Sequence, residues 1–528
     1  MWQQNYAPLG GSLGLSALAA AVPIVVLLLL LGWARKPAWL ASLAGLASAG
    51  VVAAVVYGMP FDRLVGSITF GAAFGLFPIG WVVFTAILLY RVTLESGKFE
   101  VLKDSIANLT TDQRLQALLI AFAFGAFIEG AAGFGTPVAV AGAMLAGLGF
   151  TPFYAAAICL LANTAPVAFG SIAIPITTLA LTTELPVDRL SAGVGRLCAP
   201  VSLFIPAYLI FVMSGWKGLR AVFPAAAVCG VAFAGTQFLV SNFVGPQLTD
   251  ILASMAAMGS LVALIRFWRP EAAKKNSRPA GEIFHAWVPY ILLVIFVLLW
   301  GELQPRLVKT NISFAWPLLH NTIQRMPPAV AKPSPYGAVF AFGWLSASGT
   351  ACLIAAILSA IAVGLKPRQC VNVIKQTARQ LAKAELTLAA VLGLAYLMNY
   401  SGATATLGLA FAASGVLFPF FSALLGWLGV FLTGSDTSAN ALFGTLQVVT
   451  ANKLGMNPVL MAAANSSGGV MGKMISLTSI AVAAAATSMK KGEEALLFRF
   501  TLRHSVFLAT VIGLVVVFYA YVMPQWAP

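Results

Sequence analysis

Apolar stretches of membrane-spanning length recur from one end of this 528-residue chain to the other, for example at residues 13–31, 40–57, 219–240 and 506–522. A helix of about 20 mostly apolar residues crosses the hydrocarbon core of a bilayer. Only 9% of the side chains are charged, whereas about a quarter are charged in soluble globular proteins. The sequence therefore predicts an all-α polytopic membrane protein with about 12 to 14 transmembrane segments.

The formal net charge of +15 is distributed in short clusters between the apolar stretches. Cytoplasmic loops carry such an excess of Lys and Arg, so we expect residues 266–278 and 364–383 on the cytoplasmic side and no nucleic-acid partner. Residues 1–12 carry no charge, which favours a retained first span over a signal peptide. This topology predicts both termini outside, with residues 302–336 as an ordered outer lid despite their four basic side chains.

No pattern typical of an enzyme or a metal site occurs in the chain. The five cysteines form no CxxC pair, and the three histidines are isolated in the sequence. These spacings favour small buried thiols and interfacial imidazoles. HExxH and Walker A motifs are also absent, so we expect no enzyme activity, no metal and no cofactor.

The two halves of the chain share an order of polar interruptions. A Gly-rich polar stretch lies inside apolar sequence at 127–137 and again at 431–440. Each is followed by a segment that starts with Pro and runs into a break at an Asn, at 163–166 and 465–469. This order predicts two structural repeats with broken helices or re-entrant hairpins. We place them in membrane halves 1–269 and 286–528, joined by a cytoplasmic linker at 270–285. Charge counting leaves open whether the repeats are inverted.

Helices broken at membrane depth must line a protein cavity, because backbone polar groups in lipid need partners. The free N–H groups and the helix dipole at such a break attract an anion. The alternative is that the glycines only allow close helix packing. We predict that the substrate-binding residues include Gly133, Gly135, Asn163, Ser435, Thr437, Ser438, Asn440 and Asn465.

Two acidic residues, Glu129 and Asp436, lie within these breaks. A charged carboxylate at the bilayer centre costs about 2.5–3.5 kcal/mol on insertion scales, so it faces a cavity, pairs with a cation or binds a proton. We predict that both residues take part in proton coupling. Lys473 is their candidate partner in a static ion pair, or it binds the carboxylate of the substrate.

The longer motifs of the chain resemble those of the bacterial L-lactate permease family. They are Glu-Gly-Ala-Ala-Gly-Phe-Gly at 129–135, Asn-Thr-Ala-Pro-Val-Ala-Phe-Gly at 163–170, residues 426–440 and residues 468–476. Shorter family-like segments lie at 2–6, 325–328 and 498–501, so the resemblance covers essentially the whole chain. One departure is Ser-Leu-Thr-Ser at 476–479, where the family pattern has Ser-Pro-Gln-Ser.

The resemblance implies a multi-pass transporter of the bacterial inner membrane that imports L-lactate, D-lactate and glycolate together with a proton. Physical reasoning agrees with the coupling, since an inside-negative potential opposes entry of an anion by about 2.3 kcal/mol per 100 mV. One accompanying proton removes that opposition. The expected partners are a 2-hydroxymonocarboxylate, protons and the lipid bilayer.

Other readings remain open on the sequence alone. One is a proton- or sodium-coupled transporter of a different organic anion, such as a dicarboxylate. Another is an anion channel, and a third is a membrane enzyme or a subunit of a larger complex. Competition by malate or glycolate, the ability to concentrate lactate, and product analysis would separate these readings.

Overall fold

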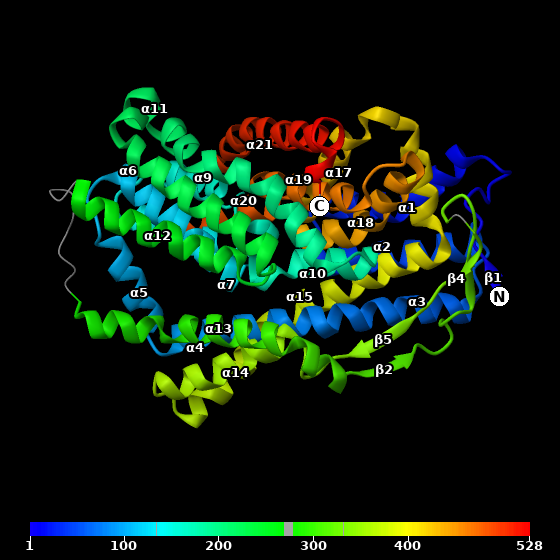
Figure 1. The fold of residues 1–528 in the computed structure, drawn as a ribbon, viewed down its shortest axis with the longest axis horizontal. Helices are drawn as coiled ribbons and strands as arrows, with labels where there is room; N and C mark the ends of the chain where they lie inside the picture. The colour runs from blue at the N-terminus through cyan, green and yellow to red at the C-terminus, as the bar shows by residue number, and fades with distance from the viewer. Residues whose placement is uncertain (134, 269–277, 331, 491, 528) are drawn as a thin grey trace.

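The computed structural model describes the chain except for residues 134, 269–277, 331, 491 and 528 (Figure 1). In the described part, ten helices are long and apolar enough to cross a membrane, and two bent helix pairs raise this to as many as twelve. The helix α11 (Val187–Phe243) is 57 residues long and is interrupted at Gly215, which has a φ of +64°. The all-α polytopic fold is confirmed.

The first helices match the predicted spans closely. They are α1 (Leu13–Gly32), α2 (Ala38–Val55), α3 (Phe61–Phe74) and α4 (Trp81–Glu95). The third span is interrupted between α3 and α4, where Phe77 leaves helical geometry before Pro78. A proline removes a helical hydrogen bond and clashes with the preceding turn, which explains the kink.

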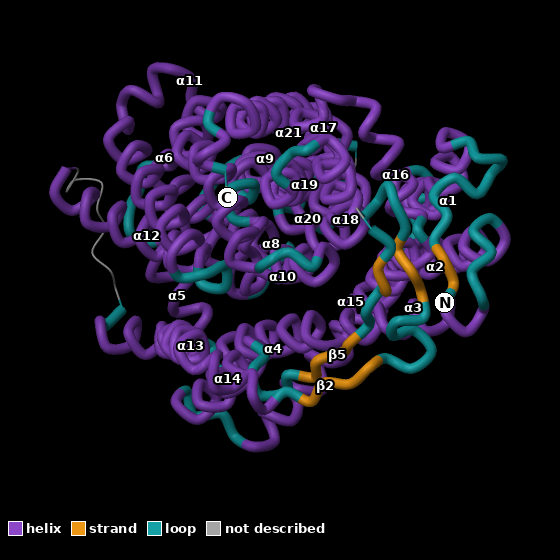
Figure 2. The backbone as a smooth tube through the Cα atoms, turned by 45° about the vertical axis from the view of Figure 1, so that its right-hand side comes forward, coloured by secondary structure: helices purple, strands orange, loops and turns teal. Residues whose placement is uncertain are grey.

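The helices form two layers, which Figure 2 shows one above the other. The flanking layer contains α2, α3, α4, α5 (Lys98–Ala107), α13 (Ala280–Leu307), α14 (Ser348–Ala362) and α15 (Pro367–Ser401). The repeat layer contains α6 (Gln113–Gln116), α7 (Gly125–Ala131), α8 (Thr136–Gly147), α9 (Pro152–Ala162), α10 (Gly170–Thr183), α11, α12 (Thr249–Trp268), α17 (Phe418–Thr433), α18 (Asp436–Leu454), α19 (Pro458–Gly472), α20 (Leu477–Ala486) and α21 (Glu493–Val517). α1 and α16 (Ala403–Phe411) contact each other and helices of both layers.

Both layers draw helices from both halves of the sequence. In the flanking layer α15 packs on α2 and α3, and in the repeat layer α18 packs on α10. The predicted halves, 1–269 and 286–528, are therefore a division of the sequence and not of space. Half of the predicted linker, residues 270–277, lies outside the described residues, and helix α13 begins at Ala280.

The predicted outer lid contains short β-strands that the sequence did not indicate. β1 (Trp2–Gln3) pairs with β3 (Ile323–Arg325), which also pairs with β4 (Ser334–Pro335). β2 (Ile312–Ala315) pairs with β5 (Val339–Phe342). Strands of two to four residues are too short to produce a recognisable alternation of polar and apolar side chains. The lid and the N-terminus lie at the same end of the molecule (Figure 1).

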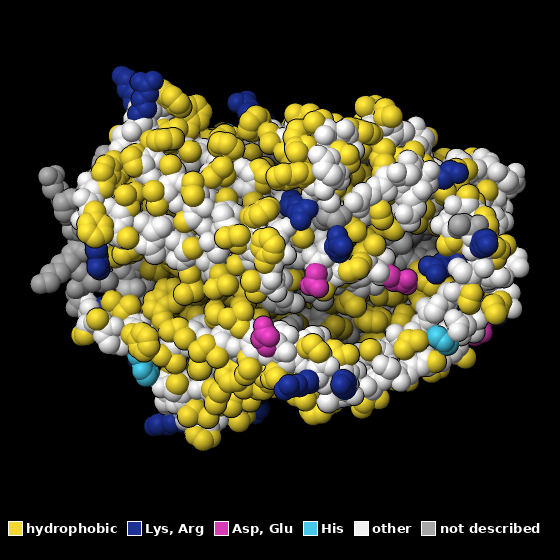
Figure 3. Space-filling model, in the orientation of Figure 1, with side chains coloured by type: hydrophobic (Ala, Val, Ile, Leu, Met, Phe, Trp, Pro, Cys, Tyr) yellow, Lys and Arg dark blue, Asp and Glu magenta, His cyan; other side chains and the backbone are white. Residues whose placement is uncertain are grey.

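The face shown in Figure 3 is largely apolar across both layers. Large exposed side chains include Leu18, Val55, Val231, Phe204 and Ile361. Contiguous exposed apolar surface of this extent is rare on soluble monomers, so it fits contact with lipid. The chain is a multi-pass membrane protein.

Within the repeat layer, α17 and α19 approach closely through glycines. A side chain added at Gly426 would meet the backbone of Asn465, and one added at Gly468 would meet the backbone of Ala423. Helices inside membranes associate largely through van der Waals packing, which small residues at the interface permit. The glycine-rich sequence of α19 is therefore required by packing as well as by any role in binding.

We predict that Gly468→Ala destabilises the protein by about 1–3 kcal/mol, because the added methyl group overpacks against the α17 backbone. Thermal unfolding in detergent measures the change. Gly259→Ala is the matched control, because Gly259 also lies within a helix and a methyl group there meets no neighbouring atom. Equal stability of the two variants would contradict the packing argument.

Candidate functional site

The first repeat contains a hairpin whose tip lies inside the protein. α7 ends at Ala131, and α8 begins at Thr136 after Gly133 and Gly135, which have φ values of +60° and +81°. Glycine adopts these angles without steric cost. Residues 112–114, before the hairpin, and residues 149–151, after it, line one surface cavity. Both arms therefore open at the same end, as in a re-entrant hairpin.

The second repeat contains a matching hairpin formed by α17 and α18. Its turn is at Gly434, which has a φ of +72°, and Ser435 caps α18 by accepting a hydrogen bond from the N–H of Ser438. Gln447, near the end of α18, donates to the carbonyl of Ser422, near the start of α17, at 3.1 Å. The two arms thus lie together at the end away from the tip.

Each repeat also contains a broken helix that meets the tip of its own hairpin. α9 and α10 differ in direction by 64°, and α19 and α20 by 45°. In the first repeat the Ser171 hydroxyl donates to the Ala132 carbonyl at 2.9 Å. In the second, the Lys473 ammonium group donates to the Gly434 carbonyl at 2.5 Å. The two contacts satisfy backbone carbonyls that the interrupted helices leave free.

The two repeats are inverted relative to each other. α10 lies alongside α18, and both helices run away from the tip of the second hairpin. The evidence is that Asn440 donates to the Pro175 carbonyl at 3.1 Å and Thr445 donates to the Thr182 carbonyl at 2.7 Å. The pairing is reciprocal, because α20 packs in turn on α8. α9 and α10 start at the open end of the first hairpin and finish towards the open end of the second. The hairpins therefore enter from opposite ends, which charge counting could not decide.

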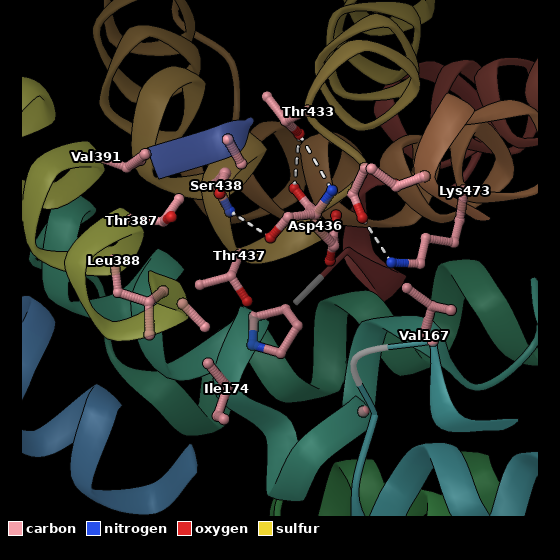
Figure 4. A pocket seen from close by; sticks show the side chains of 18 of the residues that line it. Val167, Ile174, Thr387, Leu388, Val391, Thr433, Asp436, Thr437, Ser438 and Lys473 are labelled. Atoms are coloured by element: carbon pink, nitrogen blue, oxygen red, sulfur yellow. Dashed lines mark hydrogen bonds between the residues drawn. The ribbon is translucent and has the colours of Figure 1, made fainter. Parts of the chain in front are cut away.

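The tips of both hairpins and both helix breaks line one cavity of about 260 Å³ between the two layers (Figure 4). The flanking layer and α1 supply its apolar wall, which includes Leu27, Leu31, Leu388 and Val391. Seven predicted site residues line the cavity, namely Glu129, Gly135, Ser435, Asp436, Thr437, Ser438 and Lys473. The other four, Gly133, Asn163, Asn440 and Asn465, are not among the lining residues.

Asn440 and Asn465 lie beneath the cavity in a hydrogen-bond network that ends at Asp436. The Asp436 Oδ2 accepts hydrogen bonds from Ser466 at 2.6 Å and from Asn440 at 3.3 Å. Asn465 donates to the Asn440 side-chain oxygen at 2.9 Å, and Gln447 donates to that of Asn465 at 3.0 Å. Among the described residues, Asp436 Oδ1 has no hydrogen-bond partner. The network fixes one carboxylate oxygen and leaves the other free.

Glu129 is 5% exposed and packs against Gly170, at the break between α9 and α10. In the described part of the chain its Oε2 has no hydrogen-bond partner, whereas the Asn163 side chain lies close enough to interact with the Glu129 carboxyl group. Lys473 interacts electrostatically with both Glu129 and Asp436. Lys473 is thus within electrostatic range of two carboxyl groups, one from each repeat.

The structure also places residues in the cavity wall that the sequence did not single out. They are Ser171, Thr387, Thr433, Thr478 and Ser479. Thr387 comes from the flanking layer, and no sequence signal connects α15 to the breaks. Thr478 lies in the segment that departs from the family pattern, and its hydroxyl faces Gly434. Serines and threonines that interrupt apolar runs near a break are the signal that could have found Ser171 and Thr478.

The sequence matches a family of known proteins over most of its length. The family described as L-lactate permease matches residues 16–523. The chain belongs to the L-lactate permease family. It is 45% identical to the L-lactate permease of Bacillus subtilis, with 97% of each chain covered. It is 43% identical to the glycolate permease GlcA of Escherichia coli, covering 99% of this chain and 98% of that protein.

Solved structures of more distant transporters are also similar. The Alcanivorax borkumensis YdaH transporter has a TM-score of 0.46 and 17% identity, with 87% of each chain covered. Neisseria gonorrhoeae MtrF, described as one of a class of antimetabolite efflux pumps, has a TM-score of 0.47 and 14% identity, covering 87% of this chain and 84% of that one.

We predict that Asn440→Ala lowers stability by about 1–3 kcal/mol, because its buried partners lose their hydrogen-bond donor. Asn452→Ala is the control, since Asn452 lies on the same helix but is exposed. Thermal unfolding of both purified variants in detergent measures the difference. A loss no larger than that of the control would show that the network under Asp436 is dispensable.

Proposed function

We propose that this permease imports L-lactate, D-lactate and glycolate with one proton across the inner membrane, with both chain termini outside. The observation that carries the proposal is the single cavity in which inverted hairpin tips, one lysine and two buried carboxyl groups meet. The names of the relatives support lactate and glycolate as substrates. The proton is our inference from the buried carboxyl groups and from the energetics of anion entry.

The substrate carboxylate binds between Lys473 and the N-terminus of α18. An ammonium group has three N–H donors, and the Gly434 carbonyl takes one of them. The helix N-terminus adds a partial positive charge and free backbone N–H groups. Thr437 and Ser438 also line the cavity, so their hydroxyls are placed to bond the 2-hydroxyl of the substrate, and the apolar wall accommodates the methyl group of lactate.

Proton binding at Glu129 or Asp436 compensates for the negative charge that the substrate brings into the cavity. Both carboxyl groups interact with Lys473, so an arriving carboxylate competes with them for the same cation. A proton taken up by either group removes that competition and leaves the loaded site without an added charge. The coupling therefore follows from one lysine being shared by three carboxyl groups when substrate is bound.

Alternation of access follows from movement between the two layers. The repeats interlock through α10 with α18 and α8 with α20, so they move together. The cavity lies between this unit and the helices α1, α2 and α15. Sliding of the repeat layer past that wall carries the bound substrate from one side to the other.

We predict that Lys473→Gln weakens lactate binding about 10- to 100-fold, because a hydrogen bond to a charged group contributes about 1.5–3 kcal/mol. The concentration dependence of lactate uptake into proteoliposomes measures the change. Lys453→Gln, on the exposed end of α18, serves as the control. An unchanged half-saturating concentration would remove Lys473 from the substrate site.

We predict that Glu129→Gln abolishes accumulation of lactate driven by a pH gradient, because the amide cannot take up the transported proton. A gradient of one pH unit supports about tenfold accumulation by one-to-one coupling. Glu95→Gln is the matched control, at an exposed position in the last turn of α4. Accumulation by Glu129→Gln at the wild-type level would clear Glu129 of the role.

The same vesicles separate this function from its alternatives. Glycolate should compete with labelled lactate, whereas malate should not. Stronger competition by malate would indicate a dicarboxylate transporter. Uptake that never exceeds the electrochemical equilibrium of lactate alone would indicate a channel.

A further inference from the structure

A third buried carboxyl group, that of Asp250, lies behind the first hairpin and outside the cavity wall. It is in the first turn of α12 and is 1% exposed. Neither of its carboxyl oxygens has a hydrogen-bond partner among the residues that the structure describes. Buried carboxyl groups are usually paired or hydrogen-bonded, so this residue needs a physical explanation.

Asp250 is held directly against the tip arm of the first hairpin. A methyl group built on Gly130 would lie 2.8 Å from the Asp250 Cβ, so α7 and α12 are in close contact there. Gly130 follows Glu129 in the chain, and the Glu129 and Asp250 carboxyl groups interact electrostatically. The charge on either acid therefore acts on the other, and of the two only Glu129 lines the cavity.

Among the residues that the structure describes, no cation faces Asp250. α12 packs on α7, on α11 and on residues 117–124. The titratable groups that face Asp250 are Glu129 from α7 and the buried thiol of Cys198 from α11, which is also within electrostatic reach of Asp436. Residues 117–124 carry no titratable side chain. The helix N-terminus favours a negative charge at Asp250, but Glu129 opposes it and no other group compensates.

We propose that Asp250 is a proton-holding residue of the transport cycle, which exchanges the transported proton with Glu129. This inference rests on the proposed proton-coupled function. When Asp250 carries the proton, Glu129 is ionised and pairs with Lys473. When the proton moves to Glu129, Asp250 becomes the carboxylate at the start of α12, and Lys473 is released to bind the substrate. The total number of protons is unchanged by the transfer.

A static role for Asp250 would have a different geometry. An acid retained for stability at a helix N-terminus usually accepts hydrogen bonds from that end of the helix or pairs with a cation. Neither kind of partner is recorded for Asp250 in the described part of the chain. Asp250 instead contacts Gly130, the residue next to Glu129, and its charge acts on the Glu129 carboxyl group, so the protonation states of the two acids are linked.

The experiment compares two reactions of the full-length protein in liposomes. Exchange of labelled for unlabelled lactate at equal pH needs binding and movement but no net proton transfer. Accumulation driven by a pH gradient needs binding, movement and net proton transfer. We expect Asp250→Asn to keep exchange within about twofold of wild type and to lose the roughly tenfold accumulation that one pH unit supports. Lactate-driven acidification, followed with a trapped pH dye, should be lost together with accumulation.

The matched control is Asp188→Asn, which makes the same change in the first turn of α11 at an exposed position. Both reactions should remain at the wild-type level in this variant. Asp250→Glu keeps a carboxyl group and should retain accumulation with an altered pH dependence. That variant decides the question if Asp250→Asn does not yield folded protein.

Two results would overturn the inference while the proposed function stands. One is normal accumulation and acidification in Asp250→Asn. The other is an equal loss of exchange and accumulation in a variant that unfolds at the wild-type temperature, which would indicate a binding or structural role. A wild-type protein that fails to accumulate lactate under a pH gradient would instead overturn the proposed function, and this inference with it.

Discussion

The structure depends on the need to satisfy backbone polar groups where helices are interrupted inside a bilayer. Each hairpin tip exposes carbonyl and N–H groups that lipid cannot bond. The broken helix of the same repeat provides a hydrogen-bond donor for each tip. Ser171 donates to the Ala132 carbonyl, and Lys473 donates to the Gly434 carbonyl. Because each tip needs its broken helix, the four interruptions must converge. Their convergence forms the polar lining of the cavity in an otherwise apolar protein.

The same constraint gives Lys473 two functions. It donates a hydrogen bond to a free carbonyl at the second tip, and it is the cation with which Glu129 and Asp436 interact. A charged group placed at membrane depth is costly unless it is paired, so we propose that a substrate anion enters as one of the resident negative charges is removed. In the proposed cycle a proton removes it. Structural support of the hairpin and coupling of proton to substrate thus depend on the same side chain.

Much of this arrangement was predictable from the sequence, because the interruptions break a strong apolar pattern. The spans and the paired breaks follow from local composition. Thr387 and Asp250 were not predictable, since their significance depends on which helices become neighbours. Asp250 begins an apolar segment after Gly245 and Pro246, where an acid is ordinarily a loop residue or a helix-terminal residue. The short strands of the lid were missed because two to four residues carry no detectable period.

Inversion of the repeats explains why one site can serve both sides of the membrane. The first hairpin opens at the end where residues 112–114 and 149–151 meet, and the second opens at the opposite end. The two tips therefore approach the one cavity from opposite ends of the repeat layer. The side chains of the two tips are not symmetric, since the first tip carries Glu129 and the second carries Asp436 with its hydrogen-bonded network. In the proposed cycle, a proton and a substrate anion that enter this one cavity therefore meet a different acidic group from each repeat.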